Sequence, residues 1–445
     1  MSRAQHPFTV RHRDVWSIAL PASVAFITEP IAGIVDTAII GQLGDAGLLG
    51  GLVLGAIAFD IVFSLAFFLR LGTAGLTAQA IGARDPHDGL LHLARSFLIA
   101  LVLGALVLAL AVPLHWLFAL GLAPGENVAA PFADYFYIRL WSVPFVLVNY
   151  VLLGWFYGRA AATTGMVLQL LVNVINIVLS LWFVLALGWG VPGVAWATVI
   201  GQAVAALAGI AIVLRHYGGI APIIAATPLV ALGDMAAVTR MVGLSRDLII
   251  RSLALMAAFA WFAAQSSRMG EIELSANAIL LHLFAISAFF LDGLAQAAEQ
   301  ICGKAVGANW RPAFERATVL SLSWGLVIAG ALSAFLMVSG SFAIDLMTTN
   351  AAVREMARVY LVMAALTPLT GMCAFVYDGI LIGATLNTIM RNGMLASLAV
   401  YLAVALLLQP LFGLWGLWIA FHIFLLGRAA VYAWAIERRK PAIFA

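Results

Sequence analysis

Residues 20–44 read LPASVAFITEPIAGIVDTAIIGQLG, an apolar run long enough to span a membrane that also carries two carboxylates, Glu29 and Asp36. An aspartate at the centre of a membrane helix costs about 2.5–3.5 kcal/mol on insertion. A chain that accepts this cost usually turns the charged group into a cavity and uses it there. Both residues are therefore candidate functional residues.

The two carboxylates share a helix that also contains prolines. Glu29 and Asp36 are seven residues apart, so an unbroken helix presents both on one face. Pro21 precedes them and Pro30 lies between them. Proline removes a backbone hydrogen bond and clashes with the carbonyl four residues earlier, so we expect a bend. Two roles remain open: a proton-responsive helix in an exporter, or carboxylates paired statically with a neighbour.

The composition indicates a polytopic α-helical membrane protein. The 445-residue chain is 64% hydrophobic and 10% charged, whereas soluble proteins carry about 25% charged residues. Apolar runs of about 20 residues predict membrane helices, since an open-edged sheet cannot face lipid. Twelve segments meet this requirement: 14–40, 48–72, 93–120, 130–157, 163–188, 192–215, 245–268, 275–303, 313–339, 353–382, 388–409 and 413–436.

A polar interruption and an internal repeat divide the chain into two six-helix lobes. Residues 216–245 predict a linker between lobes 1–215 and 246–445, and MAAVTRMV within it predicts a short amphipathic helix. Motifs recur at offsets of 223–226 residues in four helix pairs, as in QAIGA at 79–83 and KAVGA at 304–308. Six crossings per lobe make the repeat parallel, which predicts a substrate site at the interface between the lobes.

Arginine and lysine residues set the expected orientation. With both termini in the cytoplasm, sixteen of them fall in inside-facing segments and three, Arg268, Arg354 and Arg358, face outward. The positive-inside rule therefore predicts a multi-pass protein of the inner (plasma) membrane with both termini cytoplasmic.

Several other classes are excluded. No phosphate-binding loop, GxSxG or HExxH motif is present, so the sequence does not predict an enzyme. The net charge of +3 comes from basic residues at helix ends, which does not suggest nucleic-acid binding. Cys302 and Cys373 show no ligand spacing, so we expect neither a metal site nor a disulfide framework.

The second lobe has its own intramembrane charges. Arg251 opens the seventh segment, Asp292 and Glu299 lie seven residues apart in the eighth, and Asp378 lies in the tenth. We expect Arg251 to lie within salt-bridge reach of Asp292 or Asp378, because a buried guanidinium cannot shed its charge. A network of paired and protonated groups and a static polar core remain open as interpretations.

The chain resembles the multidrug and toxic compound extrusion (MATE) family, in its DinF (DNA-damage-inducible F) branch. The motifs that carry the resemblance are VDTA at 35–38, LR at 69–70, GLTAQA at 75–80, RD at 246–247, LDG at 291–293 and YDG at 377–379. The resemblance implies two six-helix lobes, a V-shaped cavity and export of lipophilic, often cationic compounds against inward H+ or Na+ flow. It also implies that Asp36 is the cation or proton site and that the first helix bends at Pro21.

One departure from the family bears on the coupling ion. Many relatives have Asn-x-x-x-Asp on the fifth helix, where this chain has Asn176 and then Ser180. Hard cations prefer several oxygen ligands, usually including carboxylates, so the missing acid disfavours Na+. We therefore expect one proton on Asp36, with Asn176, Ser180 and Asn173 as hydrogen-bond partners. Glu29 is a candidate partial replacement for the missing acid. No cofactor is expected.

The residues that line the substrate cavity are the hardest to predict from the sequence. Met256, Phe262, Met372 and Tyr377 are candidate cavity residues because they lie on the helices that carry buried charge, and Met suits promiscuous pockets. The repeat also places Phe262 near the position that corresponds to Asp36, so a proton site is expected in only one lobe. Expected partners are lipophilic small molecules and the lipid bilayer, with the protein as a monomer.

Two rival functions belong to other classes. A flippase for a lipid-linked precursor of the same superfamily needs a cavity rich in Arg or Lys, and only Arg70, Arg139, Arg251 and Arg428 lie within helices. A major facilitator transporter needs a basic loop after the second helix, which GARDP at 82–86 does not match. A Na+-coupled exporter is the remaining alternative.

Overall fold

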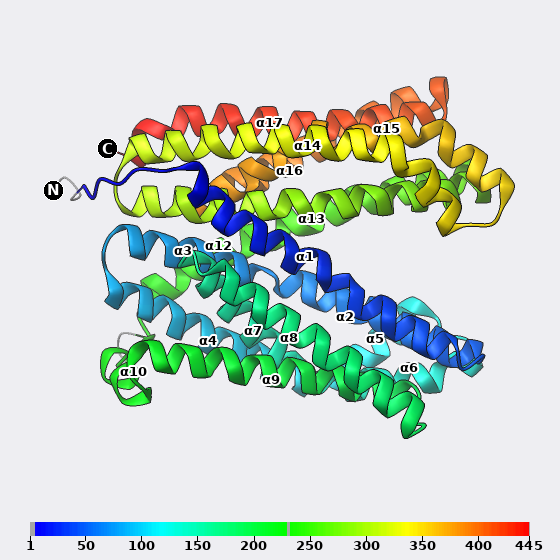
Figure 1. The fold of residues 1–445 in the computed structure, drawn as a ribbon, viewed down its shortest axis with the longest axis horizontal. Helices are drawn as coiled ribbons and strands as arrows, with labels where there is room; N and C mark the ends of the chain where they lie inside the picture. The colour runs from blue at the N-terminus through cyan, green and yellow to red at the C-terminus, as the bar shows by residue number, and fades with distance from the viewer. Residues whose placement is uncertain (1–4, 229–231, 445) are drawn as a thin grey trace. The chain divides into compact units, whose positions relative to one another are not determined.

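The protein is helical throughout the part that the computed structural model describes, residues 5–228 and 232–444 (Figure 1). The elements in chain order are α1 His12–Gly41, α2 Ala46–Ala66, α3 Phe68–Gly82, α4 Pro86–Ala109, α5 Ala111–Leu122, α6 Glu126–Arg139, the 3-10 turn η1 Leu140–Ser142, α7 Val143–Gly158, α8 Ala162–Leu181, the π-helical turn η2 Trp182–Ala186, α9 Val191–Tyr217, α10 Ile220–Ala226, α12 Met235–Met269, α13 Glu271–Gly307, α14 Arg311–Met347, α15 Ala351–Gly383, α16 Asn387–Phe412 and α17 Leu414–Ile443.

Twelve helical segments in the described ranges are long and apolar enough to cross a membrane. Each overlaps one of the twelve segments predicted from hydropathy, so the all-α prediction is confirmed. The second span consists of α2 and α3, which meet at Phe67, and the fourth consists of α6, η1 and α7. Local signals set several helix starts: the Asp45 carboxylate accepts hydrogen bonds from the amides of Gly47 (2.7 Å) and Leu48 (3.2 Å) and so caps α2.

The expectation of a separate short helix at 235–242 is wrong. These residues form the first two turns of α12, which continues to Met269. No proline interrupts the run between them and the seventh span, so the helix continues through the polar residues that an apolar window excludes. The rest of the predicted linker contains α10, and its residues 229–231 lie outside the described ranges.

Two compact units make up the fold. The amino-terminal unit comprises Val24–Ala80 and Asp85–Met241; the carboxy-terminal unit comprises Val242 onward, Ile81–Arg84 and the residues up to Ser23. The start of α1 thus packs with the second half of the chain: the Ser23 hydroxyl donates to the Phe290 carbonyl of α13 at 3.2 Å. This differs from the predicted lobe of 1–215 at its first residues; the predicted division at 216–245 stays a prediction.

The internal repeat is visible as one helix contact made twice. A Cβ on Gly154 or Gly158 of α7 would overlap the carbonyl oxygens of Arg70 and Ala74 on α3. In the other unit, a Cβ on Gly379 or Gly383 of α15 would overlap the carbonyls of Ala295 and Glu299 on α13. All four pairs of equivalent residues are 225 positions apart. Each unit therefore packs a pair of glycines against equivalent carbonyls.

The glycines before α9 and α17 repeat a backbone conformation. Gly190 has φ 57° and ψ −135°, and Gly413 has φ 56° and ψ −130°. Glycine has no Cβ and tolerates this conformation, which side chains rarely adopt. The match indicates that the repeat extends to the last helix of each unit.

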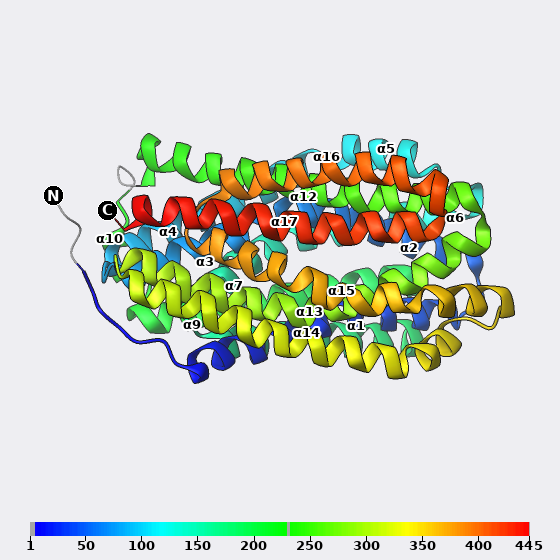
Figure 2. The ribbon, with the colours of Figure 1, turned by 90° about the horizontal axis from the view of Figure 1, so that it is seen from above.

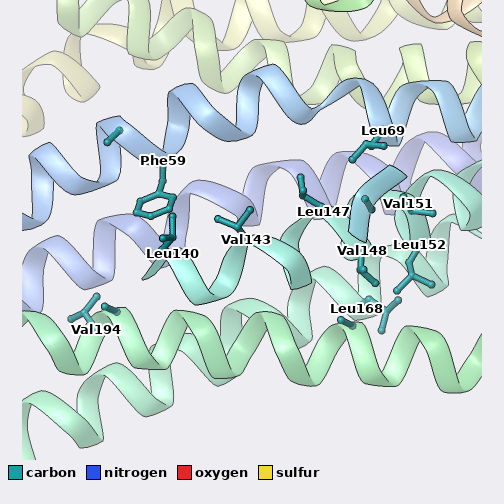
Figure 3. Close-up of a cluster of buried hydrophobic side chains, with 14 of the residues drawn as sticks. Phe59, Leu69, Leu140, Val143, Leu147, Val148, Val151, Leu152, Leu168 and Val194 are labelled. Carbon is teal, nitrogen blue, oxygen red and sulfur yellow. The ribbon is translucent and has the colours of Figure 1, made fainter. Parts of the chain in front are cut away.

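Each unit has its own apolar core. In the amino-terminal unit, α2, α6, α7 and α9 contribute to one buried cluster, and Figure 3 shows Val143, Leu147 and Val151 of α7 within it. In the carboxy-terminal unit, α13, α15 and α17 pack together around a second cluster that includes Leu280, Leu361 and Trp418 (Figure 1).

Both described termini lie at the same end of the carboxy-terminal unit (Figure 2). The His6 amide donates to the Ala308 carbonyl at 2.9 Å, and the Phe314 and Phe444 ring centroids are 5.5 Å apart. Ala308 and Phe314 flank the turn between α13 and α14. The two chain ends therefore meet at that turn.

Candidate functional site

Asp36 lies on α1 and is buried, with 6% of its surface exposed. The hydroxyl of Ser180, on α8, donates to Oδ1 of Asp36 at 2.7 Å, and Ser180 is fully buried. The two residues are 144 positions apart in the chain. The structure thus brings together the Asp36 carboxyl of α1 and the Ser180 hydroxyl of α8.

Two asparagines on α8 extend this contact. Asn176, which is buried, neighbours the Asp36 carboxyl, and its amide nitrogen donates to Thr198 Oγ1 on α9 at 2.9 Å. Asn173, expected as a third partner of Asp36, instead donates through its amide to the carbonyl of Thr28 at 2.8 Å, about two turns before Asp36 on α1. The donors around Asp36 are therefore neutral hydroxyl and amide groups.

Arg139, at the end of α6, is a cation that acts electrostatically on Asp36. Arg139 lies within electrostatic reach of Asp36 and of Asp60 on α2 but forms no salt bridge with either. Its guanidinium donates to the Tyr135 hydroxyl and lies 5.2 Å from the Phe59 ring centroid. Arg139 lies within a predicted span, and no role was predicted for it, although an intramembrane arginine is itself a signal of function.

Glu29 differs from Asp36 in its exposure and in its charged neighbours. Its side chain is exposed, and no hydrogen bond in the described ranges joins it to the Asp36 site. Instead it lies within electrostatic reach of Arg70 on α3 and of Asp60. Asp60, which is also exposed, was missed from the sequence, where an isolated aspartate in the second apolar segment was the available signal.

The equivalent position in the carboxy-terminal unit is apolar. The repeat makes Phe262, Tyr401 and Ala405 the counterparts of Asp36, Asn176 and Ser180. All three are fully buried, and Phe421 lies 5.6 Å from Phe262 and 6.4 Å from Tyr401 between ring centroids. An aromatic cluster thus fills the place that a polar site occupies in the other unit.

This burial also corrects the predicted cavity residues. Phe262 packs edge-to-face on Trp418, so it belongs to the core and does not line a cavity. Met372, at 6% exposure, packs with Leu291 in a separate, smaller apolar cluster. Both residues lie on helices that carry buried charge, but their side chains face the packed interior. Met256, another candidate, is 38% exposed, and its place in a cavity stays a prediction.

Tyr377, the fourth candidate cavity residue, is half-buried on α15, one residue before Asp378.

Asp378 forms ion pairs with two arginines of the carboxy-terminal unit. Its carboxylate accepts a hydrogen bond from Arg251 of α12 at 2.5 Å and lies 3.5 Å from the guanidinium of Arg428 of α17. Of the two partners left open for Arg251, the ion pair forms with Asp378, while Asp292 lies within electrostatic reach. Arg428 was not included in the predicted network because it lies in the twelfth span, 50 residues after Asp378.

The remaining predicted site residues are Glu299 on α13 and the two prolines of α1. Glu299 is buried on α13, where its carbonyl meets Gly383. Pro21 and Pro30 both lie inside α1, which runs without interruption from His12 to Gly41. The expected bend at these prolines stays a prediction.

Comparisons with known proteins agree on one family. The model of the MatE family matches residues 21–182 and 248–411, one copy in each half. The chain is 35% identical to DNA damage-inducible protein F of Escherichia coli, over 97% of this chain and 93% of that protein. It is 21% identical to the multidrug export protein MepA of Staphylococcus aureus, over 89% of this chain and 87% of that protein.

Solved structures of similar fold cover nearly the whole chain. A MATE crystal structure in the straight conformation matches with a TM-score of 0.88 at 18% identity, over 97% of this chain and 96% of that one. An outward-facing multidrug resistance MATE family transporter matches with a TM-score of 0.83 at 20% identity, over 98% and 99%.

Proposed function

The chain belongs to the MatE family of multidrug and toxic compound extrusion transporters, and we propose that it is a proton-coupled exporter of lipophilic, often cationic compounds. It is a transporter and not an enzyme. The curated relatives named for multidrug export, such as MepA, support the substrate class.

Asp36 carries the proposal of proton coupling. Its partners are neutral donors, and no cation lies within salt-bridge distance of its carboxyl in the described residues. The Asn176 amide oxygen is buried and has no donor in the same ranges. A protonated Asp36 carries an O–H, which is what such an acceptor lacks, whereas a charged Asp36 carries none.

A proton suits this site better than Na+. Ser180 supplies a hydroxyl where many relatives have a second carboxylate, so one acid remains to balance a hard cation. Binding of a single proton neutralises Asp36 fully, whereas a Na+ ion would need further oxygen ligands.

Coupling follows if the two protonation states favour two arrangements of α1. Protonation removes a charge from a helix that contains Pro21 and Pro30, where backbone hydrogen bonds are missing. A drug that binds only one arrangement is then released when the proton binds, and this differential interaction is what coupling requires. Solved MATE relatives have been described in straight and bent conformations, which supports two states.

The flippase alternative is disfavoured because, of the four arginines within the helices, only Arg70 and Arg139 form no ion pair in the described residues. Arg251 and Arg428 both pair with Asp378, so neither is available for a pyrophosphate head group in this structure. The orientation with both termini in the cytoplasm stays part of the proposal, as does the inner membrane. The meeting of both chain ends at the α13–α14 turn supports a common side for them.

Purified protein in proteoliposomes tests the function. Uptake of an ethidium-like cationic dye is measured with an imposed pH gradient or with an imposed Na+ gradient of equal size. We expect uptake with the pH gradient and none with Na+ alone. Uptake driven by Na+ alone would overturn proton coupling, and no uptake with either gradient would contradict the exporter.

A further inference from the structure

Arg70 is a buried guanidinium without an acceptor. The residue is 7% exposed, and within residues 5–228 and 232–444 no oxygen accepts a hydrogen bond or forms an ion pair with its guanidinium. Arginine does not deprotonate in proteins, so the charge is present in every state. Buried donors without partners are costly, so native structures supply partners for nearly all of them.

Aromatic rings hold this guanidinium in place. Its Cζ atom lies 4.3 Å from the Phe67 centroid, 4.5 Å from Phe26 and 5.7 Å from Tyr157. Phe26 and Tyr157 pack edge-to-face at 6.1 Å, which fixes two walls of this enclosure. Cation–π contacts offset part of the desolvation, by up to about 2 kcal/mol each. Ring faces are weak acceptors, however, and the N–H groups keep their capacity for an anion.

The fold itself does not need this charge. In the repeat, Arg70 corresponds to Ala295, and the same contact with a helix glycine forms at both positions: Gly154 against Arg70, and Gly379 against Ala295. An alanine therefore satisfies the packing in the carboxy-terminal unit. The guanidinium is an addition that the helix contact does not explain.

Two exposed carboxylates accompany Arg70. Glu29 lies on α1, one turn after Phe26, and is within electrostatic reach of both Arg70 and Asp60. Tyr150, on α7, lies within electrostatic reach of Glu29, Arg70 and Asp60. Its ring packs edge-to-face against Phe67, with 5.6 Å between the ring centroids. The amino-terminal unit thus combines a fixed cation, two accessible anions and aromatic surface.

We propose that these groups form a subsite for amphoteric aromatic compounds, in which Arg70 binds the carboxylate of the substrate and Glu29 with Asp60 attracts its cationic end. A guanidinium binds a carboxylate through two parallel hydrogen bonds, and no protein oxygen in the described residues accepts from Arg70. The inference rests on the proposed exporter function and specifies a class within its substrates.

Rhodamine B and its ethyl ester provide the test, because they differ only in a free or masked carboxylate. Binding is measured by fluorescence anisotropy with purified protein in nanodiscs, without any gradient. Arg70→Gln should weaken rhodamine B binding about 10-fold or more and strengthen binding of the ester, since the cationic dye no longer faces a cation. Glu29→Gln should weaken binding of both dyes.

Two results would overturn this subsite. Equal weakening of both dyes by Arg70→Gln would mean that Arg70 only maintains packing, and equal affinities in parent and variant would mean that it binds no substrate carboxylate. If Arg70→Gln does not fold, the parent alone decides: it must bind rhodamine B more tightly than the ester. If the parent protein binds the ester but fails these tests, only the proposed subsite is contradicted. If the parent protein binds neither dye, the proposed exporter function is contradicted as well.

Discussion

Ser180 donates a hydrogen bond of 2.7 Å to Asp36 across 144 residues of sequence, and both side chains are buried. This pair is the centre of the proposed coupling site. Asp36→Asn keeps the size of the side chain and removes the titration. We expect it to abolish proton-driven dye efflux in proteoliposomes while the protein stays folded and still binds dye. Efflux at the parent's rate would place the coupling site elsewhere, among Asp292, Glu299 and Asp378.

The hydroxyl of Ser180 should matter less than the carboxyl. A hydrogen bond to a charged group contributes about 1.5–3 kcal/mol, so Ser180→Ala should slow pH-driven efflux by about 10-fold without abolishing it. Asn176→Ala should act in the same direction. Ser142→Ala is a matched control, because Ser142 is equally buried and its hydroxyl has no partner in the described ranges. Equal effects of Ser180→Ala and Ser142→Ala would argue against a role for the Asp36 contact.

Asp378 should be the most sensitive position of the second charge cluster. Asp378→Ala leaves Arg251 and Arg428 without their shared carboxylate, and breaking a buried pair costs about 3–5 kcal/mol. Arg251→Ala leaves Asp378 with Arg428, so its cost should be smaller. Thermal unfolding of the detergent-solubilised variants measures both. As a control, Arg311→Ala removes an exposed pair with Glu315 and should change the melting temperature little. A stability of Asp378→Ala equal to the parent's would refute the ion-pair assignment.

Phe262 should behave as a core residue. Phe262→Ala removes a ring packed on Trp418 and Phe421 and should destabilise the protein by about 3–5 kcal/mol. Met256→Ala, at an exposed position, is the control and should change stability by less than about 1 kcal/mol. Unfolding temperatures and dye affinities are measured together. Unchanged stability with altered affinity for several dyes would return Phe262 to the substrate cavity.

The orientation can be tested at the segment between α10 and α12. In a background with Cys302 and Cys373 replaced by alanine, a membrane-impermeant thiol reagent added to intact cells should not label Asp234→Cys, which lies at an exposed position. Permeabilised cells should show labelling, which establishes that the site is reactive. Labelling in intact cells would reverse the proposed topology.

The sequence predicted the helices well because membrane spans depend on one property, apolar length. It also predicted the repeat, since glycines in close helix contacts tolerate little change: Gly158 and Gly383 keep their places at the same offset. Asp36 and Ser180 were predicted together only through the family resemblance, because nothing in the local pattern joins two helices 144 residues apart.

Other site features could not be read from the sequence. Helix composition does not reveal which face of α12 is packed, so Phe262 was assigned to a cavity although it lies in the core. Ion pairing depends on distance in space, so Arg428 was not assigned to Asp378. Asp60 and Arg139 lie in helices that carry no other signal, and their relation to Asp36 and Glu29 exists only once those helices pack.

Helix α1 has a consequence for how the chain is made. Ser23 bonds to the Phe290 carbonyl, which is synthesised 267 residues later. At about 5–20 residues per second, a ribosome needs about 15–50 s to cover that distance. The first turns of α1 therefore spend this time in the membrane without their final neighbours on α13. The carboxy-terminal unit therefore includes residues up to Ser23 that were made long before its other helices. A product that stops after the sixth span contains the start of α1 but lacks α13, to which Ser23 bonds.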